Sequence, residues 1–450
     1  MYVNNTPNIK SQPMLHKEVI QSLHELFSSK TYHADKIEIT LPKQTGGYAP
    51  DVIIKAGNTN IAAIEIKTSN ALKREARRFN NDYYFQFKVR FFVYTDGQEF
   101  IIFDRFQNTK TGKQADLKRF SDIITESLST DTTDKIKKDV IDIFLDEATK
   151  KQDSLPQIKQ LIINNKNRIY DELKISNDYK LYFEGGKTDL NSFENQFFIN
   201  LLDNKVTGKF YRYCSFERIF EDLNNKTIAM LGLPGMNDTT EPNYIDNYLN
   251  DTNDHFWELP HQTIEAINRR FILSCTTLRD NLLQWRLYGD NAKGACIEFK
   301  VKSKLKEKER FYLGKIKYAN SNDEHYELVF LKRIIDKIKR QLGLELRFVL
   351  LYVWRHFFKP KEYEHEKEVR LLYLPKQGTV ARNWILAEPY AIVNPMVLFN
   401  IDEFPLEITE IILGHKSAER ELNKVQLKQM LNDKGLSGIV INESTTKVYR

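Results

Sequence analysis

Two short apolar runs on either side of a tight turn are the feature that most constrains how this chain can fold. Residues 48–55 and 60–67 each have the length and the apolar content of a β-strand, and residues 56–59 between them read Ala-Gly-Asn-Thr. A Gly-Asn pair is typical of the short turn of a β-hairpin. The sequence therefore predicts two antiparallel strands joined by this turn.

Charged residues stand where the first strand begins and the second ends. Asp51 opens the first run, and Glu65 and Lys67 close the second. Because successive side chains of a strand point to opposite faces, Glu65 and Lys67 share one face, and the hairpin can bring Asp51 to the same edge. Two carboxylates on a half-buried surface are costly without a partner, and a hard cation such as Mg²⁺ or Mn²⁺ supplies one. We expect Asp51 and Glu65 to ligate this metal, with the backbone carbonyl of Ile66 as a further ligand.

The chemistry expected of these groups is hydrolysis of a phosphodiester bond. A metal held there polarises the phosphodiester and lowers the pKa of a bound water. Lys67 then orients that water or neutralises the developing charge. A simpler interpretation stays open, because exposed strands often alternate charged and apolar residues as Glu65, Ile66 and Lys67 do.

The segments that flank the hairpin carry a family resemblance. Residues 14–27 have the apolar stripe of a helix, and residues 91–97 read Phe-Phe-Val-Tyr-Thr-Asp-Gly before a further strand at residues 99–104. Over about residues 10–128 the chain resembles the PD-(D/E)xK nuclease superfamily, in particular the N-terminal nuclease domain of type I restriction-enzyme R subunits. The resemblance implies a restriction-endonuclease-like α/β fold, and it implies a catalytic glutamate on the first helix, for which Glu18 is the candidate.

A second helix is expected at residues 71–88. Relatives in that family carry Gln-x-x-x-Tyr on this helix, whereas here Asn80 and Tyr84 stand nearest to that place, with Gln86 slightly displaced. The start of the helix is basic, and two interpretations stay open for it: a surface that follows a phosphate backbone, or an ordinary solvated helix face. Its basic residues are Lys73, Arg74, Arg77 and Arg78.

The length of 450 residues predicts two or three domains. We expect a nuclease-like domain at residues 1–130, a helical connector at residues 131–204 and an α+β domain at residues 205–450. The longest apolar stretch, residues 348–354, is too short for a membrane span, and no signal peptide is evident. The three cysteines are widely spaced, which predicts neither a disulfide framework nor a zinc site and favours the cytoplasm.

The C-terminal half contains a set of short motifs in a distinctive order. They are Tyr-Arg-Tyr at 211–213, Asn-Asp-x-x-Glu at 237–241, a serine-bearing strand at 271–277, Trp-x-x-Tyr at 285–288 and Glu-x-Glu-x-Arg-Leu at 366–371. Residues 205–450 resemble a widespread bacterial domain of unknown function through these motifs. The resemblance implies no settled chemistry.

The order of these motifs is also similar to that of ADP-ribosyltransferases. Mapped onto this chain, the similarity implies NAD-binding candidates at Arg212 or Tyr213, Ser274 and Glu368, and it rests on order along the chain alone. A structural interpretation stays open as well. Glu368 and its neighbours would then form a surface ladder of paired charges, and the Trp-x-x-Tyr motif would belong to the core.

Two functions of different classes follow. The first is a cytoplasmic Mg²⁺- or Mn²⁺-dependent endonuclease acting on DNA, an anti-phage or restriction-type defence effector that works with a second copy of itself or with a defence-system partner, and whose C-terminal domain senses or supplies a second activity. The alternative is an NAD-dependent ADP-ribosyltransferase-like toxin or modifier with a DNA-binding N-terminal domain. A non-catalytic nucleic-acid-binding protein is disfavoured, because phosphate binding calls for positive charge and not for Asp51 and Glu65.

Overall fold

The hairpin expected from the two apolar runs is present in the computed structural model. β3 (Val52–Ala56) pairs antiparallel with β4 (Thr59–Ile66), and Gly57 in the turn has a φ of 54°. The positive φ is the conformation that a tight hairpin turn requires and that glycine adopts without strain. β4 then pairs in parallel with β5 (Phe91–Thr95).

The structure describes residues 12–27, 30–32, 35–42, 49–79, 82–106, 112–129, 133–150, 155–176, 179–185, 191–202, 206, 208–233, 244–245, 270–302, 311–375, 383–387 and 392–446. The chain forms two compact units. Unit 1 consists of residues 1–185 and 330–349, and unit 2 of residues 186–329 and 350–450. The three ranges expected from the sequence stay a prediction.

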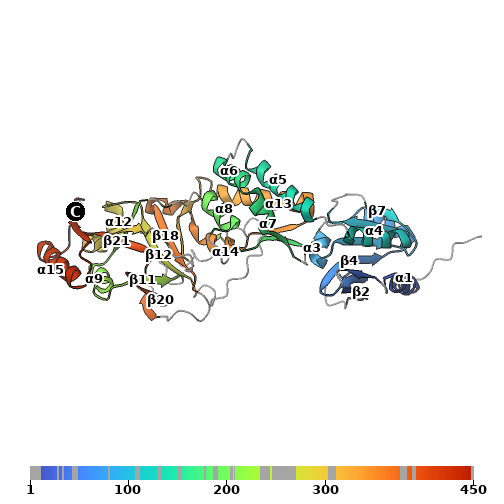
Figure 1. Ribbon diagram of the computed structural model, residues 1–450, viewed down its shortest axis with the longest axis horizontal. Helices are drawn as coiled ribbons and strands as arrows, with labels where there is room; N and C mark the ends of the chain where they lie inside the picture. The colour runs from blue at the N-terminus through green and yellow to red at the C-terminus, as the bar shows by residue number, and fades with distance from the viewer. Residues whose placement is uncertain are drawn as a thin grey trace, which may run out of the picture. The chain divides into compact units, whose positions relative to one another are not determined.

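Unit 1 contains a seven-stranded sheet whose strands follow one another in chain order (Figure 1). α1 and α4 pack on one face through a buried apolar cluster, and α2 and α3 cover the other face. The remaining elements of this sheet layer are α1 (Gln12–Phe27), β1 (Thr31–Tyr32), β2 (Asp35–Thr40), α2 (Ser69–Ala76), α3 (Asp82–Phe87), β6 (Phe100–Asp104), β7 (Lys113–Ala115) and α4 (Leu117–Ser129).

A three-stranded sheet and several helices complete unit 1. β9 lies between β8, its antiparallel neighbour, and β16, which pairs with it in parallel from far along the chain. These elements are α5 (Thr133–Glu147), α6 (Pro156–Asn164), α7 (Lys166–Glu172), β8 (Leu173–Ile175), β9 (Lys180–Phe183), the part of α13 (Tyr326–Leu342) from Phe330 on, and β16 (Glu345–Arg347).

The structure corrects the expectation of one continuous helix at residues 71–88. α2 ends at Ala76, and α3 begins at Asp82. Phe79, between them, stacks on Phe103 of the sheet with ring centroids 4.0 Å apart. Placing this aromatic ring against the sheet is the local interaction that accompanies the break, and helical periodicity alone does not reveal it.

Unit 2 is built on a ten-stranded sheet. Its main path runs β19-β20-β11-β12-β10-β13-β21-β22, and β18 pairs with β12 on one side and β14 on the other. The strands are β10 (Lys209–Cys214), β11 (Thr227–Gly232), β12 (Phe271–Thr276), β13 (Ala295–Val301), β14 (Phe311–Lys315), β18 (Glu368–Tyr373), β19 (Asn383–Ala387), β20 (Ile392–Asn400), β21 (Leu406–Leu413) and β22 (Val440–Glu443).

The two faces of this sheet differ. α9 and α15 cover an extended apolar core on one face, whereas a small cluster around Trp285 of α12 lies on the other. The other elements of unit 2 are α8 (Phe193–Leu201), α9 (Phe216–Asn224), α12 (Leu282–Leu287), η4 (Asp290–Ala292), β15 (Lys317–Tyr318), α14 (Leu351–Trp354), η5 (Arg355–Phe357), β17 (Phe358–Lys359), η6 (Lys361–Glu366) and α15 (Arg420–Asp433).

The expectation of a mixed α/β chain is confirmed, since both units combine helices with sheets. The restriction-endonuclease-like and α+β architectures stay predictions. Among the described helices, none combines the length and the apolar character that crossing a membrane demands.

Gly343 offers a test of the packing in unit 1. Its φ is 62°, and a Cβ atom added there would lie 2.5 Å from the backbone oxygen of Arg105, whose side chain also donates a hydrogen bond to the Gly343 carbonyl. Gly185 has a φ of 90° and open space around it. We predict that Gly185→Ala lowers the free energy of unfolding by about 1–2 kcal/mol through backbone strain alone. Gly343→Ala should lower it by a further ~1–3 kcal/mol through the clash. Denaturant titration of both variants measures the difference, and equal losses would contradict the packing described.

Candidate functional site

The open end of the β3–β4 hairpin in unit 1, called the rim below, consists of Asp51 and residues 65–67. A hydrogen bond from backbone to side chain joins its two strands. The Ile66 N–H donates to Oδ2 of Asp51 at 2.7 Å. The register pairs Val52 with Ile64, so the next positions outward, Asp51 and Glu65, face each other across the two strands. The hairpin therefore brings together the two carboxylates that the sequence places fourteen residues apart.

Glu65 is buried, and its charge is balanced locally. Its side chain is 5% exposed, and Nζ of Lys67 lies 2.5 Å from its Oε2 atom. Across the parallel pairing with β5, Glu65 faces Tyr94. Burial, followed by the negative charge of Glu65, raises the pKa of Tyr94 above its ordinary value of 10. Tyr94 is therefore a neutral phenol beside the carboxylate, a neighbour that the sequence analysis did not identify.

A histidine of the first helix lies near Asp51, and the catalytic role expected of Glu18 stays a prediction. Glu18 is exposed on α1, whereas Nε2 of His16 lies 4.0 Å from Oδ2 of Asp51. This ring nitrogen is buried and has no hydrogen-bond partner in the structure. The family resemblance pointed to a glutamate on this helix, and only the packing of the helix shows that the histidine is the side chain facing Asp51.

The rim contains oxygen and nitrogen atoms of the kinds that bind divalent cations, but these atoms do not form a complete coordination shell. Among the described residues, no group of three His, Cys, Asp or Glu side chains is placed to hold a metal ion. Asp51 is 27% exposed, Glu65 faces it, and the buried Nε2 of His16 lacks a partner. The nitrogen of His16 lies near one of the two carboxylates, that of Asp51, so the metal expected from the sequence stays a prediction.

The basic residues of α2 lie close behind this rim in the chain. The helix begins at Ser69, two residues after Lys67. Lys73 and Arg74 of the helix, and Arg77 and Arg78 just after it, have exposed side chains. Weak surface ion pairs with Glu75 and Glu99 engage three of these four cations. Asn80 lies outside the described residues, and Gln86 is exposed. Both interpretations of the basic helix start stay open.

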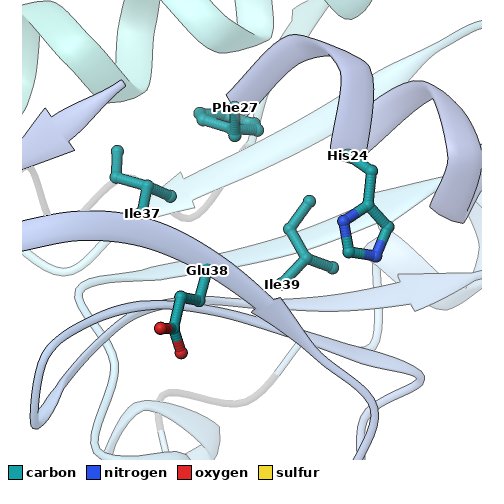
Figure 2. Close-up of a pocket in the computed structure, with 5 residues that line it drawn as sticks. All are labelled: His24, Phe27, Ile37, Glu38 and Ile39. Atoms are coloured by element: carbon teal, nitrogen blue, oxygen red, sulfur yellow. The ribbon is translucent and has the colours of Figure 1, made fainter. Parts of the chain in front are cut away.

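A pocket in unit 1 lies away from the carboxylates. It has a volume of about 290 Å³ and lies between α1 and β2. Figure 2 shows Ile37 and Ile39 directed towards the helix and Glu38 directed away from it. His24, which lines the pocket, is eight residues from His16, or roughly 12 Å along the helix axis. The pocket is therefore separate from the candidate metal site.

Unit 2 contains a buried ionic cluster centred on Glu368. Arg370 donates two hydrogen bonds to Glu368, at 2.9 and 3.0 Å, and Nζ of Lys359 lies 2.8 Å from its Oε2 atom. Burial alone would raise the pKa of Glu368, but the attraction of Arg370 and Lys359 is stronger and lowers it from 4.5 to about 2. Glu368 is 4% exposed, so the prediction of a surface ladder is wrong here.

Glu366 extends the same cluster. It accepts a hydrogen bond from the hydroxyl of Tyr288 at 2.5 Å and one from Lys359 at 2.8 Å. Trp285, the other residue of the Trp-x-x-Tyr motif, is fully buried and donates from Nε1 to Asp280. The prediction that this tryptophan belongs to the core is confirmed. The tyrosine of the motif links α12 to the ionic cluster.

The structure gathers some of the residues proposed for NAD binding and separates others. Ser274 lies opposite Arg370 in the strand register, near enough to Glu368 to contribute to its lowered pKa. Tyr213 uses its hydroxyl within the fold, donating to Leu278 and accepting from the Asn281 N–H. Arg212 points to the opposite face of the sheet, where its Nη1 atom lies 3.6 Å from Asp222. The transferase alternative stays a prediction that this geometry does not favour.

Comparison with known proteins adds one finding. Residues 284–371 match the model of a family described as a protein of unknown function (DUF2971). No curated protein and no solved structure matches the chain. The matched segment contains Trp285, Tyr288, Lys359, Glu366, Glu368 and Arg370. The resemblance of the C-terminal half to a domain of unknown function therefore holds in this coarser sense, over the matched segment.

The ionic cluster predicts a specific dependence of stability on pH. The folded pKa of Glu368 lies below the unfolded value, so its contribution is complete above pH 4.5 and is lost as the pH falls through about 2. Glu368→Gln leaves Arg370 and Lys359 without their shared carboxylate, and we expect it to lower the free energy of unfolding near neutral pH by about 3–5 kcal/mol. Denaturant titrations at several pH values should show the gap to the parent narrowing below pH 4.5. Glu362→Gln, at an exposed position of η6, is the control and should change little. A stability difference between Glu368→Gln and the parent that stays constant with pH would refute the assignment.

Proposed function

We propose that unit 1 is a metal-dependent nuclease that hydrolyses phosphodiester bonds at the rim formed by Asp51, Glu65 and Lys67. The observation that carries the proposal is the hydrogen bond that locks Asp51 to the end of β4, opposite Glu65. The order of elements supports it as well. A helix, a run of antiparallel strands, helices and a parallel strand follow one another as α1, β1 to β4, α2, α3 and β5, in keeping with the nuclease resemblance.

Each residue of the rim has a distinct role in this proposal. Asp51 and Glu65 would hold a divalent cation, Mg²⁺ or Mn²⁺, with the Ile66 carbonyl as the further ligand expected from the sequence. The cation would supply Lewis-acid polarisation of the phosphodiester. Lys67, which is 28% exposed, keeps its ammonium beside Glu65 and can also reach an incoming phosphate oxygen. Tyr94 stays neutral and can donate a hydrogen bond to Glu65.

The proposed substrate is DNA. The exposed cations of α2 follow directly after Lys67 in the chain and give the rim a positive neighbour, which a polyanionic substrate requires. The resemblance to the nuclease domain of restriction enzymes is the ground for DNA rather than RNA, and for a role as an anti-phage or restriction-type effector. Unit 2 would then serve as the sensing or second effector part of the protein.

Cleavage assays on plasmid DNA test the catalytic assignment. We predict that Asp51→Asn, Glu65→Gln and Lys67→Met each lower the rate of Mg²⁺- or Mn²⁺-dependent cleavage about a hundredfold or more, because each removes a group that acts on the reacting phosphate or its cation. EDTA should stop the parent protein. Glu38→Gln is a matched control, since Glu38 is a carboxylate on the neighbouring strand with a single surface ion pair to Lys55. Three variants that cut as fast as the parent would rule the assignment out.

The salt dependence of DNA binding tests the role of α2. Lys73→Gln combined with Arg77→Gln removes two exposed cations near the rim. If both contact phosphates, the slope of log K against log salt should become shallower by about 1.8. Arg420→Gln combined with Lys424→Gln removes the same charge from α15 and should leave the slope unchanged. Fluorescence anisotropy on a short duplex between 50 and 200 mM salt gives both slopes. Equal slopes in the two double variants would show that α2 is an ordinary solvated helix.

A further inference from the structure

The outer edge of β2 is the feature of unit 1 that the proposed function leaves unexplained. β1 borders the sheet, but it pairs only with the first two residues of β2, and the Ile37 N–H then donates to the Lys30 carbonyl at 3.0 Å. Backbone groups of a strand point alternately to its two sides, so those of Ile39, and of Leu41 directly after β2, face the same outer side. Within the described part of the chain, no group hydrogen-bonds to the backbone of Ile39 or Leu41 on that side.

An exposed leucine and an apolar pocket lie beside this edge. Leu41 is 58% exposed, and its side chain falls on the same face as those of Ile37 and Ile39, because successive side chains alternate. These two isoleucines line the pocket of about 290 Å³ together with Phe27 of α1 (Figure 2), and Leu41 is not among the described residues that line it. Burying a leucine side chain is worth about 2 kcal/mol, so the pocket and the leucine suit each other.

We infer that β2 pairs antiparallel with β2 of a second copy of this chain, about a two-fold axis at Thr40. In this register Ile39 of one copy lies opposite Leu41 of the other, and the two residues exchange hydrogen bonds through their outward N–H and C=O groups. The axis repeats the exchange on its other side. An axis one residue earlier, at Ile39, would place the second strand where Lys30 already bonds to Ile37, so the structure excludes that register.

The side chains and charges suit the same register. Leu41 of one copy lies beside Ile39 of the other, on the face where the pocket opens. Glu38 is the one charged residue in the range 38–42 and lies opposite Pro42, so no two like charges meet across the axis. The nitrogen of Pro42 stands at an alternate position that faces away from the second copy, so its missing N–H removes no bond between the copies.

The interface expected from this pairing is small. Stable protein complexes bury about 800 Å² on each partner, and a strand edge of this length covers less, so we expect a dissociation constant in the micromolar range. The pairing uses none of the residues of the rim. The inference therefore goes beyond the proposed nuclease and does not depend on it.

Sedimentation velocity of the full chain provides the first test. The parent should pass from monomer to dimer between about 1 and 200 µM. Leu41→Asp should raise the dissociation constant about tenfold or more, because it carries a charge into an apolar pocket. Leu422→Asp is the matched control, since Leu422 is an exposed leucine of α15 in unit 2, and it should associate as the parent does. A parent that stays monomeric, or equal effects of the two substitutions, would refute the inference.

Cross-linking at the axis tests the register itself. Thr40 lies opposite Thr40 of the other copy in a pair without hydrogen bonds, where Cα atoms are about 4.5 Å apart, within the range that a disulfide spans. Thr40→Cys should therefore form a covalent dimer on mild oxidation. In Glu38→Cys the two Cα atoms are offset by four residues and lie roughly 14 Å apart, so this variant should cross-link no more than the parent. Equal yields in the two variants would contradict an axis at Thr40.

The two proposals fail in distinguishable ways. Asp51→Asn, which alters the rim, should associate as the parent does. If the parent cuts DNA but stays monomeric, the pairing of β2 is wrong and the nuclease proposal stands. If the parent associates through β2 but cuts no DNA, the pairing stands and the nuclease proposal is wrong. Thermal unfolding of Leu41→Asp should match that of the parent at low concentration, because the leucine is exposed in the single copy.

Discussion

The register between β3 and β4 is the constraint on which the rim of unit 1 depends. Side chains alternate along a strand, so a slip of one residue would turn Asp51 to the opposite face and separate it from Glu65. The apolar residues on the other face prevent the slip, because Val52, Ile54 and Ile64 are completely buried there. The hydrophobic core beneath the carboxylates thus fixes the strand register that positions them. The hydrogen bond from the Ile66 N–H then fixes the orientation of the Asp51 side chain.

The hairpin residues could be predicted from the sequence because the interactions that position them are local in the chain. Asp51, Glu65 and Lys67 lie on one hairpin, whose turn and alternation are visible in the residues themselves. His16 and Tyr94 were not found, because each reaches the rim through tertiary packing: the rotation of α1 on the sheet, and the parallel pairing of β5 with β4. A helical wheel shows which side of α1 is apolar, but not which polar residue next to that side meets the neighbouring strand.

In unit 2, the alternation of charged and apolar residues led to a wrong prediction of how exposed the charged side chains are. Glu366, Glu368 and Arg370 alternate as an exposed ladder of charges would, yet β18 is an inner strand with β12 and β14 on its two sides. Nζ of Lys359 lies 2.8 Å from the carboxylates of both Glu366 and Glu368. Its positive charge offsets the cost of burying these two negative charges. The alternation of charges correctly indicated that these side chains pair with one another. Their burial follows from the position of β18 between two other strands, which the sequence pattern does not reveal.

The discontinuity of unit 1 has a consequence for how this protein is made. β9 receives its parallel neighbour β16 only from residues 345–347, far beyond the rest of that sheet. A ribosome delivers the N-terminal residues first, so the ribbon of β8 and β9 emerges with one edge unpaired while a long stretch of unit 2 is still being translated. An open strand edge invites pairing with a foreign chain. The nascent polypeptide thus passes through a period of exposure to aggregation that ends only when β16 arrives.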